Sequence, residues 1–425
     1  MNRFYVVLTV ALSDLEVSSG RQVTVSNVHP KLSNTNSIVN GHDGTYTFFE
    51  GYYWYHAAEY GLCKEPPGNG CDQTPGPVGP PYPAPGHCGF QANHNVSVWR
   101  SKDLSSGSWE FMGRAVRCDT DVPNCKIMYR PHLIYNPTTR LYVLFVNYVE
   151  NNGGYGGNAV FTAQHPAGPF ALQTPQMNLT RLCPGPAHPP GHICGKAQGG
   201  CGDYDIVVDP SDGEAYIIYG CNYYMGIERL TKDYLNGTGE NSTVEGGLFG
   251  GSTFPEYFVE APAFFKRGDT FYAMFGHCCC FCYQGSGVMV YTAKSPKGPW
   301  KPQCSDVQAG GSCLAPSGDL ACVPELDTLP HVGGAPTPGQ GCNYQGKPEH
   351  SSLRAQQNFV ITVNAGGKEQ FIWTGDRWQQ SPDGIKGHEG QTWALLEFDV
   401  EGNVHPLRWQ DNITFEVDEA KMDFV

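Results

Sequence analysis

One short phrase recurs five times along the chain: a turn, followed by a strand rich in Tyr, Phe and β-branched residues. The five copies lie at residues 50–55, 139–145, 213–219, 268–275 and 368–373. Each copy is typical of a mostly buried strand that is entered through a tight turn. An internal repeat of one small unit indicates a repeat architecture, in which neighbouring units bury one another.

A second strand follows each copy and is usually closed by a polar turn and an aromatic residue. These strands lie at 96–100, 159–163, 223–229, 288–293 and 393–398. Five such units predict an all-β fold, a five-bladed β-propeller, as a single domain over residues 30–425. A β-sandwich with similar hairpins is the alternative. The copies are unevenly spaced because of insertions at 63–88, 183–201 and 310–346, which we expect to be long loops pinned by disulfides.

The cysteine content predicts an oxidising compartment. Seventeen cysteines are too many for free thiols in a reducing cytosol, and their odd number leaves at least one unpaired or bonded to another chain. Residues 1–20 resemble a short signal peptide, with a truncated start as the alternative. We therefore expect a secreted glycoprotein. Its Asn-X-Ser/Thr sequons lie at Asn95, Asn178, Asn236, Asn241 and Asn412.

The net charge of −14 restricts the classes of partner that the protein is expected to bind. Nucleic acid is disfavoured because each phosphate contact requires Lys or Arg. No stretch of the sequence reaches the ~18 apolar residues of a membrane span. A neutral oligo- or polysaccharide fits this charge better, and we expect the protein to be a monomer.

Several carboxyl groups precede aromatic strand copies. Glu260 lies in Tyr-Phe-Val-Glu-Ala-Pro-Ala-Phe-Phe and has the most apolar surroundings of any Asp or Glu, although an ion pair with a nearby Lys or Arg is the alternative. Asp203 and Asp205 lie two residues apart, on one face of a strand, and Asp43 precedes the first copy. In a propeller these positions converge on the axis. An acid with a raised pKa beside an ionised carboxylate is what cleavage of a glycosidic bond requires.

At these residues the chain resembles glycoside hydrolase family 43, and in particular its exo-β-1,3-galactanase-like branch. The specific parts are the Glu-Ala-Pro-Ala segment at 260–263 and the Gly-Asp-Arg-Trp segment at 375–378, within a resemblance over roughly 36–410. The resemblance implies an inverting hydrolase of β-1,3-galactan, with arabinan and xylan as alternative substrates. In such an enzyme the acid and the base lie ~6.5–9.5 Å apart.

The resemblance also implies roles for single residues. Glu260 is the general acid, and Asp203 orients it and tunes its pKa, with Asp205 as the alternative. The base is either Asp43, as in the family at large, or Gln356, at the place where the galactanase-like branch has a Gln thought to hold the water.

Other residues are candidates for contacts with the sugar: His42, Arg130 and Trp378, together with Asp205. The chain departs from the branch at Tyr129, where a Glu is usual, and at His42-Asp43-Gly44, where His-Gly-Gly is usual. The departure at Tyr129 favours an alternative function, a secreted glycan-binding propeller without catalysis. A phosphorylase or transferase on the same scaffold is a third hypothesis. No cofactor is expected, although a structural calcium ion could lie in the central channel.

The sequence disfavours two other kinds of site. The His-Cys-Cys-Cys-Phe-Cys run at 277–282 suggests zinc, but adjacent cysteines on a strand point to opposite faces, so disulfides explain it better. No Gly-x-Ser-x-Gly elbow of a serine hydrolase is present.

Overall fold

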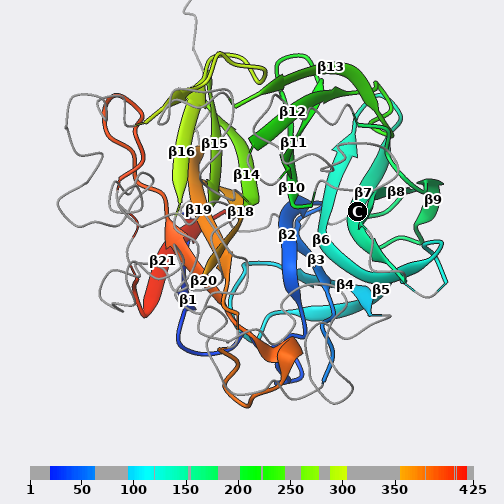
Figure 1. The fold of residues 1–425 in the computed structure, drawn as a ribbon. Coiled ribbons are helices and arrows are strands. Elements are labelled where there is room, and N and C mark those ends of the chain that lie inside the picture. Colours follow the sequence, from blue (N-terminus) through cyan, green and yellow to red (C-terminus); the bar gives the residue numbers. More distant parts are fainter. Residues whose placement is uncertain are drawn as a thin grey trace, which may run out of the picture.

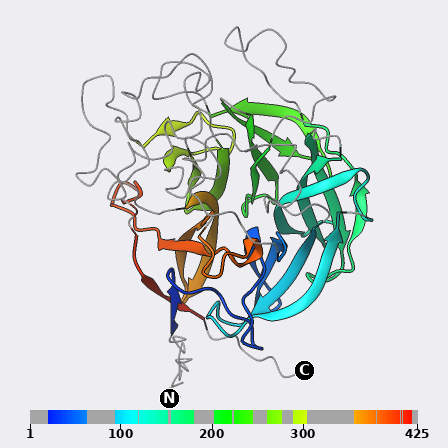
Figure 2. The ribbon, with the colours of Figure 1, turned by 60° about the horizontal axis from the view of Figure 1, so that its bottom comes forward.

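The computed structural model describes residues 20–62, 94–118, 120–151, 155–179, 202–221, 224–244, 260–276, 288–303, 355–378, 380–405, 407 and 409–418. These residues form five small antiparallel sheets and one two-stranded sheet. Figures 1 and 2 show the five sheets arranged radially around a common axis. The predicted all-β fold, a five-bladed β-propeller, is confirmed.

Each blade is a meander whose strands follow one another in chain order. Blade 1 contains β2 (His42–Phe49), β3 (Tyr52–Ala58), β4 (Asn95–Ser101) and β5 (Glu110–Arg117). Blade 2 contains β6 (Cys125–Asn136), β7 (Leu141–Glu150), β8 (Tyr155–Ala163) and β9 (Ala171–Thr174). Blade 3 contains β10 (Tyr204–Val208), β11 (Ala215–Cys221), β12 (Tyr224–Leu230) and β13 (Gly237–Thr243). Blade 4 contains β14 (Glu260–Arg267), β15 (Thr270–Gly276), β16 (Met289–Ala293) and β17 (Lys301–Pro302). Blade 5 contains β18 (Gln356–Ala365), β19 (Lys368–Asp376) and β20 (Gln391–Leu395).

The repeated aromatic phrase forms the second strand of every blade, and the strand predicted after it forms the third. The first strands β2, β6, β10, β14 and β18 contact one another in cyclic order and so surround the axis. Each of the five junctions between neighbouring blades has its own cluster of buried apolar side chains. The aromatic repeat therefore supplies the layers that hold blade against blade.

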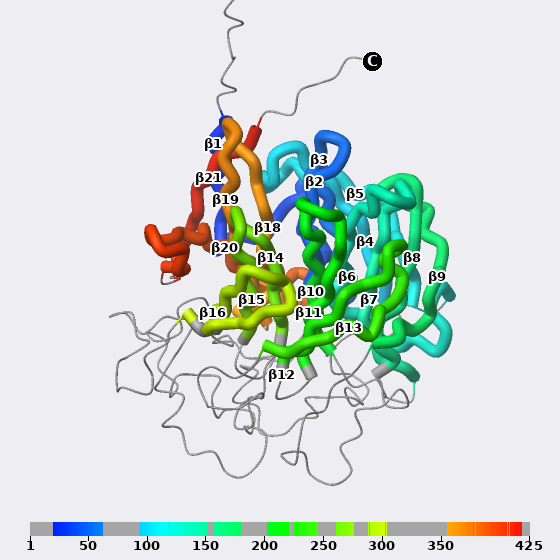
Figure 3. The backbone as a smooth tube through the Cα atoms, turned by 90° about the horizontal axis from the view of Figure 1, so that it is seen from above, coloured from blue at the N-terminus to red at the C-terminus, as the bar shows by residue number. Residues whose placement is uncertain are grey.

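The ring is closed by strands from the two ends of the described chain. β1 (Arg21–Ser26) pairs antiparallel with β21 (Asn412–Val417), and both lie beside blade 5 in Figure 3. The domain therefore includes residues before 30, its predicted start, because β1 pairs with β21. Their apolar residues join the cluster between blades 5 and 1.

The first strands are irregular where they begin. β2, β6, β14 and β18 each contain a bulge or register shift against the second strand of the blade. Three bulge residues have a left-handed backbone: Asp43 (φ 55°), Arg130 (φ 47°) and Ala261 (φ 53°). A bulge re-aims side chains away from the regular alternation of the strand. At the first bulge a Cβ on Gly44 would lie 2.0 Å from the carbonyl oxygen of His56, so the close approach of β2 to β3 requires glycine.

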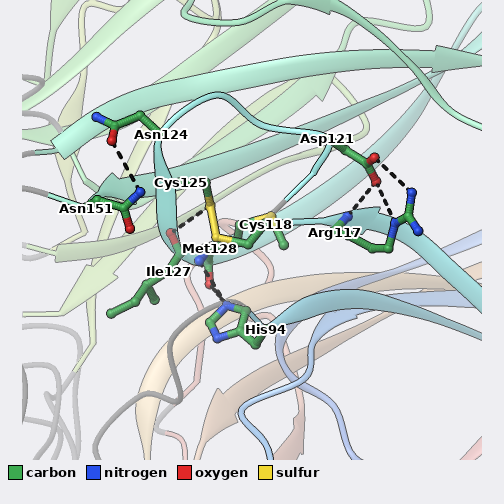
Figure 4. The surroundings of a disulfide bond; sticks show 9 residues. All are labelled: His94, Arg117, Cys118, Asp121, Asn124, Cys125, Ile127, Met128 and Asn151. Carbon is green, nitrogen blue, oxygen red and sulfur yellow. Dashed lines mark hydrogen bonds and ion pairs between the residues drawn. A yellow bond between two sulfur atoms is a disulfide. The ribbon is translucent and has the colours of Figure 1, made fainter.

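Cys118 and Cys125 form a disulfide that joins the end of blade 1 to the start of blade 2 (Figure 4). Beside it, His94 hydrogen-bonds the backbone of Met128. Residues 1–19, the predicted loop insertions at 63–88, 183–201 and 310–346, and the cysteine run at 277–282 lie outside the described residues. Within the described part of the chain, no helix has the length and apolar character needed to cross a bilayer.

Candidate active site

Arg130 lies at the centre of the propeller and joins its own blade to the four others. Its side chain is 1% exposed. Nε donates to the carbonyl oxygen of Tyr204 at 3.1 Å, and Nη2 donates to that of Pro262 at 2.8 Å. Nη1 is 3.5 Å from Oδ1 of Asp43, and the guanidinium group stacks 4.2 Å from the ring centroid of Phe359. One buried cation therefore connects all five blades at the axis.

Three aspartates near the axis accept backbone N–H groups from the following blade. Asp376 Oδ1 accepts the N–H of Asp43 at 3.3 Å, and Asp43 Oδ2 accepts the N–H of Arg130 at 3.0 Å. Asp203 Oδ2 accepts the N–H of Ala261 at 3.0 Å. All three donors are the left-handed bulge residues. The bulges therefore turn backbone donors toward carboxylates, and such charge-assisted bonds allow these carboxylates to lie near the axis.

The pKa of Asp43 is raised well above its ordinary value, chiefly by burial. Arg130 opposes the shift, whereas the charges of Asp376 and Asp203 add to it. Burial also raises the pKa of Asp203, against the charge of Arg130 and the N–H of Ala261. A single arginine among several carboxyl groups thus favours retention of a proton in the cluster, which acid–base chemistry at near-neutral pH requires.

Glu260 opens β14 on the inner ring of blade 4, where its backbone pairs with Gly276. The next residue, Ala261, is the one that Asp203 holds. The structure therefore brings Asp203 to the peptide that follows Glu260, and its effect on the Glu260 carboxyl group stays a prediction. The side chain of Glu260 lies outside the described part of the structure, so the position of its carboxyl group stays a prediction.

Gln356, Trp378 and His42 lie together beside Asp43. Gln356 Oε1 accepts a hydrogen bond of 2.7 Å from Trp378 Nε1. The ring centroids of His42 and Trp378 are 4.5 Å apart, and His42 also packs 4.9 Å from Tyr60. The Tyr60 hydroxyl donates to Asp43 Oδ2 at 3.3 Å. Gln356, Trp378 and His42 are thus linked through Tyr60 to Asp43, another predicted site residue.

Asp205 is buried and fastens neighbouring strands together. Its Oδ1 is 2.7 Å from Nδ1 of His132 and accepts the N–H of Ile206 at 2.8 Å. Its Oδ2 accepts the N–H of Phe264 at 2.6 Å. These bonds join blade 3 to blades 2 and 4. Its contact with substrate, like that of the buried Arg130, stays a prediction.

Three residues of the cluster had not been singled out from the sequence: Asp376, Glu389 and Tyr60. Asp376 belongs to the Gly-Asp-Arg-Trp segment, which was the signal that could have identified it. Glu389 Oε2 lies 2.9 Å from Nε2 of His42 and 2.7 Å from Nζ of Lys386. Nothing in the local sequence pattern marks Glu389 or Tyr60.

Tyr129 stands at the position where a Glu was expected. It is 9% exposed and belongs to an apolar cluster with Tyr60 and Trp378. A tyrosine here adds aromatic surface to the cluster around His42, in place of a charge.

No group of three or more His, Cys, Asp or Glu able to hold a metal ion occurs in the part of the chain that the structure describes. The guanidinium group of Arg130 lies against Asp43, where it competes with any cation. Calcium also takes carbonyl and water oxygens as ligands, so the structural calcium ion considered from the sequence stays a prediction.

Comparisons with known proteins identify the fold. No protein-family model and no curated protein sequence matches the chain. A β-1,3-galactosidase of glycoside hydrolase family 43, solved with galactodeoxynojirimycin, is similar in structure with a TM-score of 0.61 and 20% identity, over 91% of this chain and 99% of that one. The exo-β-1,3-galactanase of Clostridium thermocellum is similar with a TM-score of 0.61 and 19% identity, over 93% of this chain and 68% of that one.

Another family 43 β-1,3-galactosidase is similar with a TM-score of 0.58 and 21% identity. The match covers 92% of this chain but only 64% of that protein. The chain therefore has the five-bladed propeller fold of glycoside hydrolase family 43. Exo-β-1,3-galactanases are among its structural neighbours, and the resemblance seen in the sequence is confirmed at the level of the fold.

Proposed function

We propose that the protein is a secreted, inverting, exo-acting glycosidase whose substrate is β-1,3-galactan. The observation that carries the proposal is the bond from Asp203 to the N–H of Ala261, which fixes the peptide directly after Glu260. Asp43, a buried carboxyl group, lies in blade 1, which is not adjacent to blade 4, the blade of Glu260. Two carboxyl groups on opposite sides of a sugar are what inversion requires.

In this mechanism Glu260 donates a proton to the glycosidic oxygen as the bond to the anomeric carbon breaks. Asp43 removes a proton from the water that attacks the opposite face of that carbon. Asp43 suits this role better than Gln356, since its carboxyl group, once ionised, can accept the proton and an amide cannot. Gln356, already an acceptor for Trp378, then helps to orient the water or the sugar.

The proposed substrate is supported by the structural neighbours, which include family 43 β-1,3-galactosidases and exo-β-1,3-galactanases. Arabinan and xylan are the alternative substrates, and contact of the buried Trp378 and His42 with a sugar stays a prediction. Secretion is supported by the 17 cysteines and the Cys118–Cys125 disulfide.

The test compares wild type with Glu260→Gln on oligosaccharides of β-1,3-galactan, arabinan and xylan, with the released anomer followed by NMR. We expect the wild type to release a monosaccharide of inverted configuration, and the variant to be slower by about 10²–10⁴-fold. Glu369→Gln, at an exposed glutamate near the start of β19, is the matched control and should retain full activity.

The base is identified with Asp43→Asn and Gln356→Ala. Azide is a nucleophile that needs no base, so it should restore turnover to Asp43→Asn alone. If azide restored turnover only to Gln356→Ala, Gln356 would be the residue that activates the water.

A glycan-binding propeller without catalysis is the second candidate, favoured by Tyr129 at the usual Glu position. It would be identified if wild type and Glu260→Gln bound the same oligosaccharides and neither cleaved them. Turnover that depends on inorganic phosphate would instead indicate a phosphorylase.

A further inference from the structure

Lys31 lies between the first and the last blade, inside a cage of four aromatic rings. Its Nζ is 4.5 Å from the ring centroids of Tyr46 and Tyr55, and 5.3 Å from those of Trp109 and Trp393. The first three rings belong to blade 1 or the turn before β5, and Trp393 belongs to β20 of blade 5. A cation among aromatic faces is attracted to each of them, so Lys31 holds the two blades together where the ring closes.

Hydrogen bonds lead from this cage to the candidate active site. Nζ of Lys31 donates to the hydroxyl of Tyr46 and to Oε1 of Gln391, the latter at 3.3 Å. The Tyr46 hydroxyl donates to the same Oε1. Nε2 of Gln391 donates to Asp376 Oδ1 at 2.9 Å, and this oxygen also accepts the N–H of Asp43. A continuous chain therefore runs from Lys31 to the backbone of Asp43.

The two donors on Oε1 fix the orientation of the Gln391 amide. An amide side chain can rotate by half a turn and exchange its oxygen with its NH₂ group. With Lys31 and Tyr46 both donating to the oxygen, the NH₂ group must face Asp376. Without Lys31 the oxygen keeps only the Tyr46 donor, so the amide is held less firmly against Asp376.

We propose that Lys31 is a positioning residue for Asp43: it orients Gln391, which holds the Asp376 carboxylate against the N–H of Asp43. The kinetic consequence rests on the proposed function, in which Asp43 activates the water. The positioning itself is a property of the backbone and can be measured without any substrate.

The surroundings of Lys31 are compatible with this role. A cavity of about 390 Å³ borders Lys31, Gln391 and Trp393. Burial lowers the pKa of Lys31 to about 7, against the opposing charge of Asp376. An uncharged amine would keep its N–H donors but would lose most of its attraction to the rings. The ionisable groups that face Lys31 or line this cavity are Tyr46, Tyr55, Asp376, His29, Arg377, His388 and Glu389.

The test measures hydrogen exchange of two backbone amides in protein labelled with [¹⁵N]Asp and [¹⁵N]Ala. Asp43 and Ala261 each donate their N–H to an aspartate of the preceding blade, so Ala261 is a matched internal control. Lys31→Met should reduce protection at Asp43 about tenfold relative to Ala261, as expected for one lost hydrogen bond. Lys31→Arg, which keeps charge and donors, should restore most of that protection.

Lys294→Met is the control for removal of a lysine, because Lys294 is exposed and bonds only Thr270 among the described contacts. It should leave both amides unchanged. Equal loss of protection at Asp43 and Ala261 in Lys31→Met, or no loss at Asp43, would overturn the proposal. If Lys31→Met does not fold, Gln391→Met leaves the cage filled and must itself reduce protection at Asp43.

A kinetic measurement separates this proposal from the proposed function. On β-1,3-galactan, Lys31→Met should lower kcat about tenfold with little change in KM, since the water is misplaced and the sugar is not. A wild type that cleaves no glycan would refute the proposed function, while the exchange measurement would still decide the role of Lys31.

Discussion

Replacing Arg130 with Met removes the guanidinium group at the axis while keeping much of the side-chain volume. The carbonyl oxygens of Tyr204 and Pro262 then lose a donor, and the buried carboxyl group of Asp43 loses its cation. A buried charge without its partner costs about 3–5 kcal/mol. Each buried acceptor without a donor costs about 1–3 kcal/mol, and these costs are not fully additive. We expect the free energy of unfolding to fall by about 5 kcal/mol at pH 7.

The loss of stability in Arg130→Met should depend on pH in a defined direction. Burial already raises the pKa of Asp43 in the folded protein, and Arg130 is the main influence that opposes this rise. A carboxyl group with a raised folded pKa contributes stability that is present below its unfolded pKa of about 3.9, and this stability is lost as the pH rises through the folded pKa. Arg130→Met raises the folded pKa further. The deficit should therefore be smaller at pH 4 than at pH 8.

Urea unfolding followed by tryptophan fluorescence at both pH values measures the effect. Arg229→Met is the matched control: Arg229 pairs with Glu214 and Glu240 at the surface, so its loss should cost about 1 kcal/mol or less. Adding Asp43→Asn to Arg130→Met should reduce the pH dependence, and Asp203 is then the carboxyl group that still lacks the charge of Arg130. The reasoning is refuted if Arg130→Met costs no more than Arg229→Met, or if its deficit is the same at both pH values.

Three further predictions concern other parts of the structure. Asp203→Asn removes a negative charge near Glu260, so the alkaline limb of the kcat/KM profile should move to lower pH; an unchanged limb would argue against a tuning role. Gly44→Ala places a Cβ 2.0 Å from the His56 carbonyl oxygen and should cost about 1–3 kcal/mol by calorimetry, whereas an unchanged Tm would contradict the close approach. Replacing both cysteines of the Cys118–Cys125 disulfide with Ser should lower the free energy of unfolding by about 2 kcal/mol, and a urea midpoint equal to wild type would show that the bond contributes nothing.

The candidate site was only partly visible in the sequence. Asp43 and Asp203 were predicted to face the axis and Gln356 to hold the water, and each lies on or directly before a first strand of a blade. Asp376 and Lys31 were not identified as members of the site. Asp376 ends a second strand and Lys31 lies in a connecting segment, so neither occupies the place in the repeat that marked the other candidates.

The bulges, too, could not be predicted from the sequence pattern. A left-handed backbone is ordinarily a glycine position, yet here it occurs at Asp43, Arg130 and Ala261. The conformation is stabilised at each of them by a hydrogen bond to an aspartate of another blade. Such a bond joins residues far apart in the chain, so the local sequence does not predict it.

What the sequence alone determined is the blade, and with it the number of blades. A turn followed by an aromatic, β-branched strand is a local pattern, and its five copies are sufficient to predict five sheets. What only the tertiary structure decided is which side chains meet at the axis. Closure of the ring brings Asp43 to Asp376, 333 positions along the chain, and this contact depends on the combined twist and packing of all five blades.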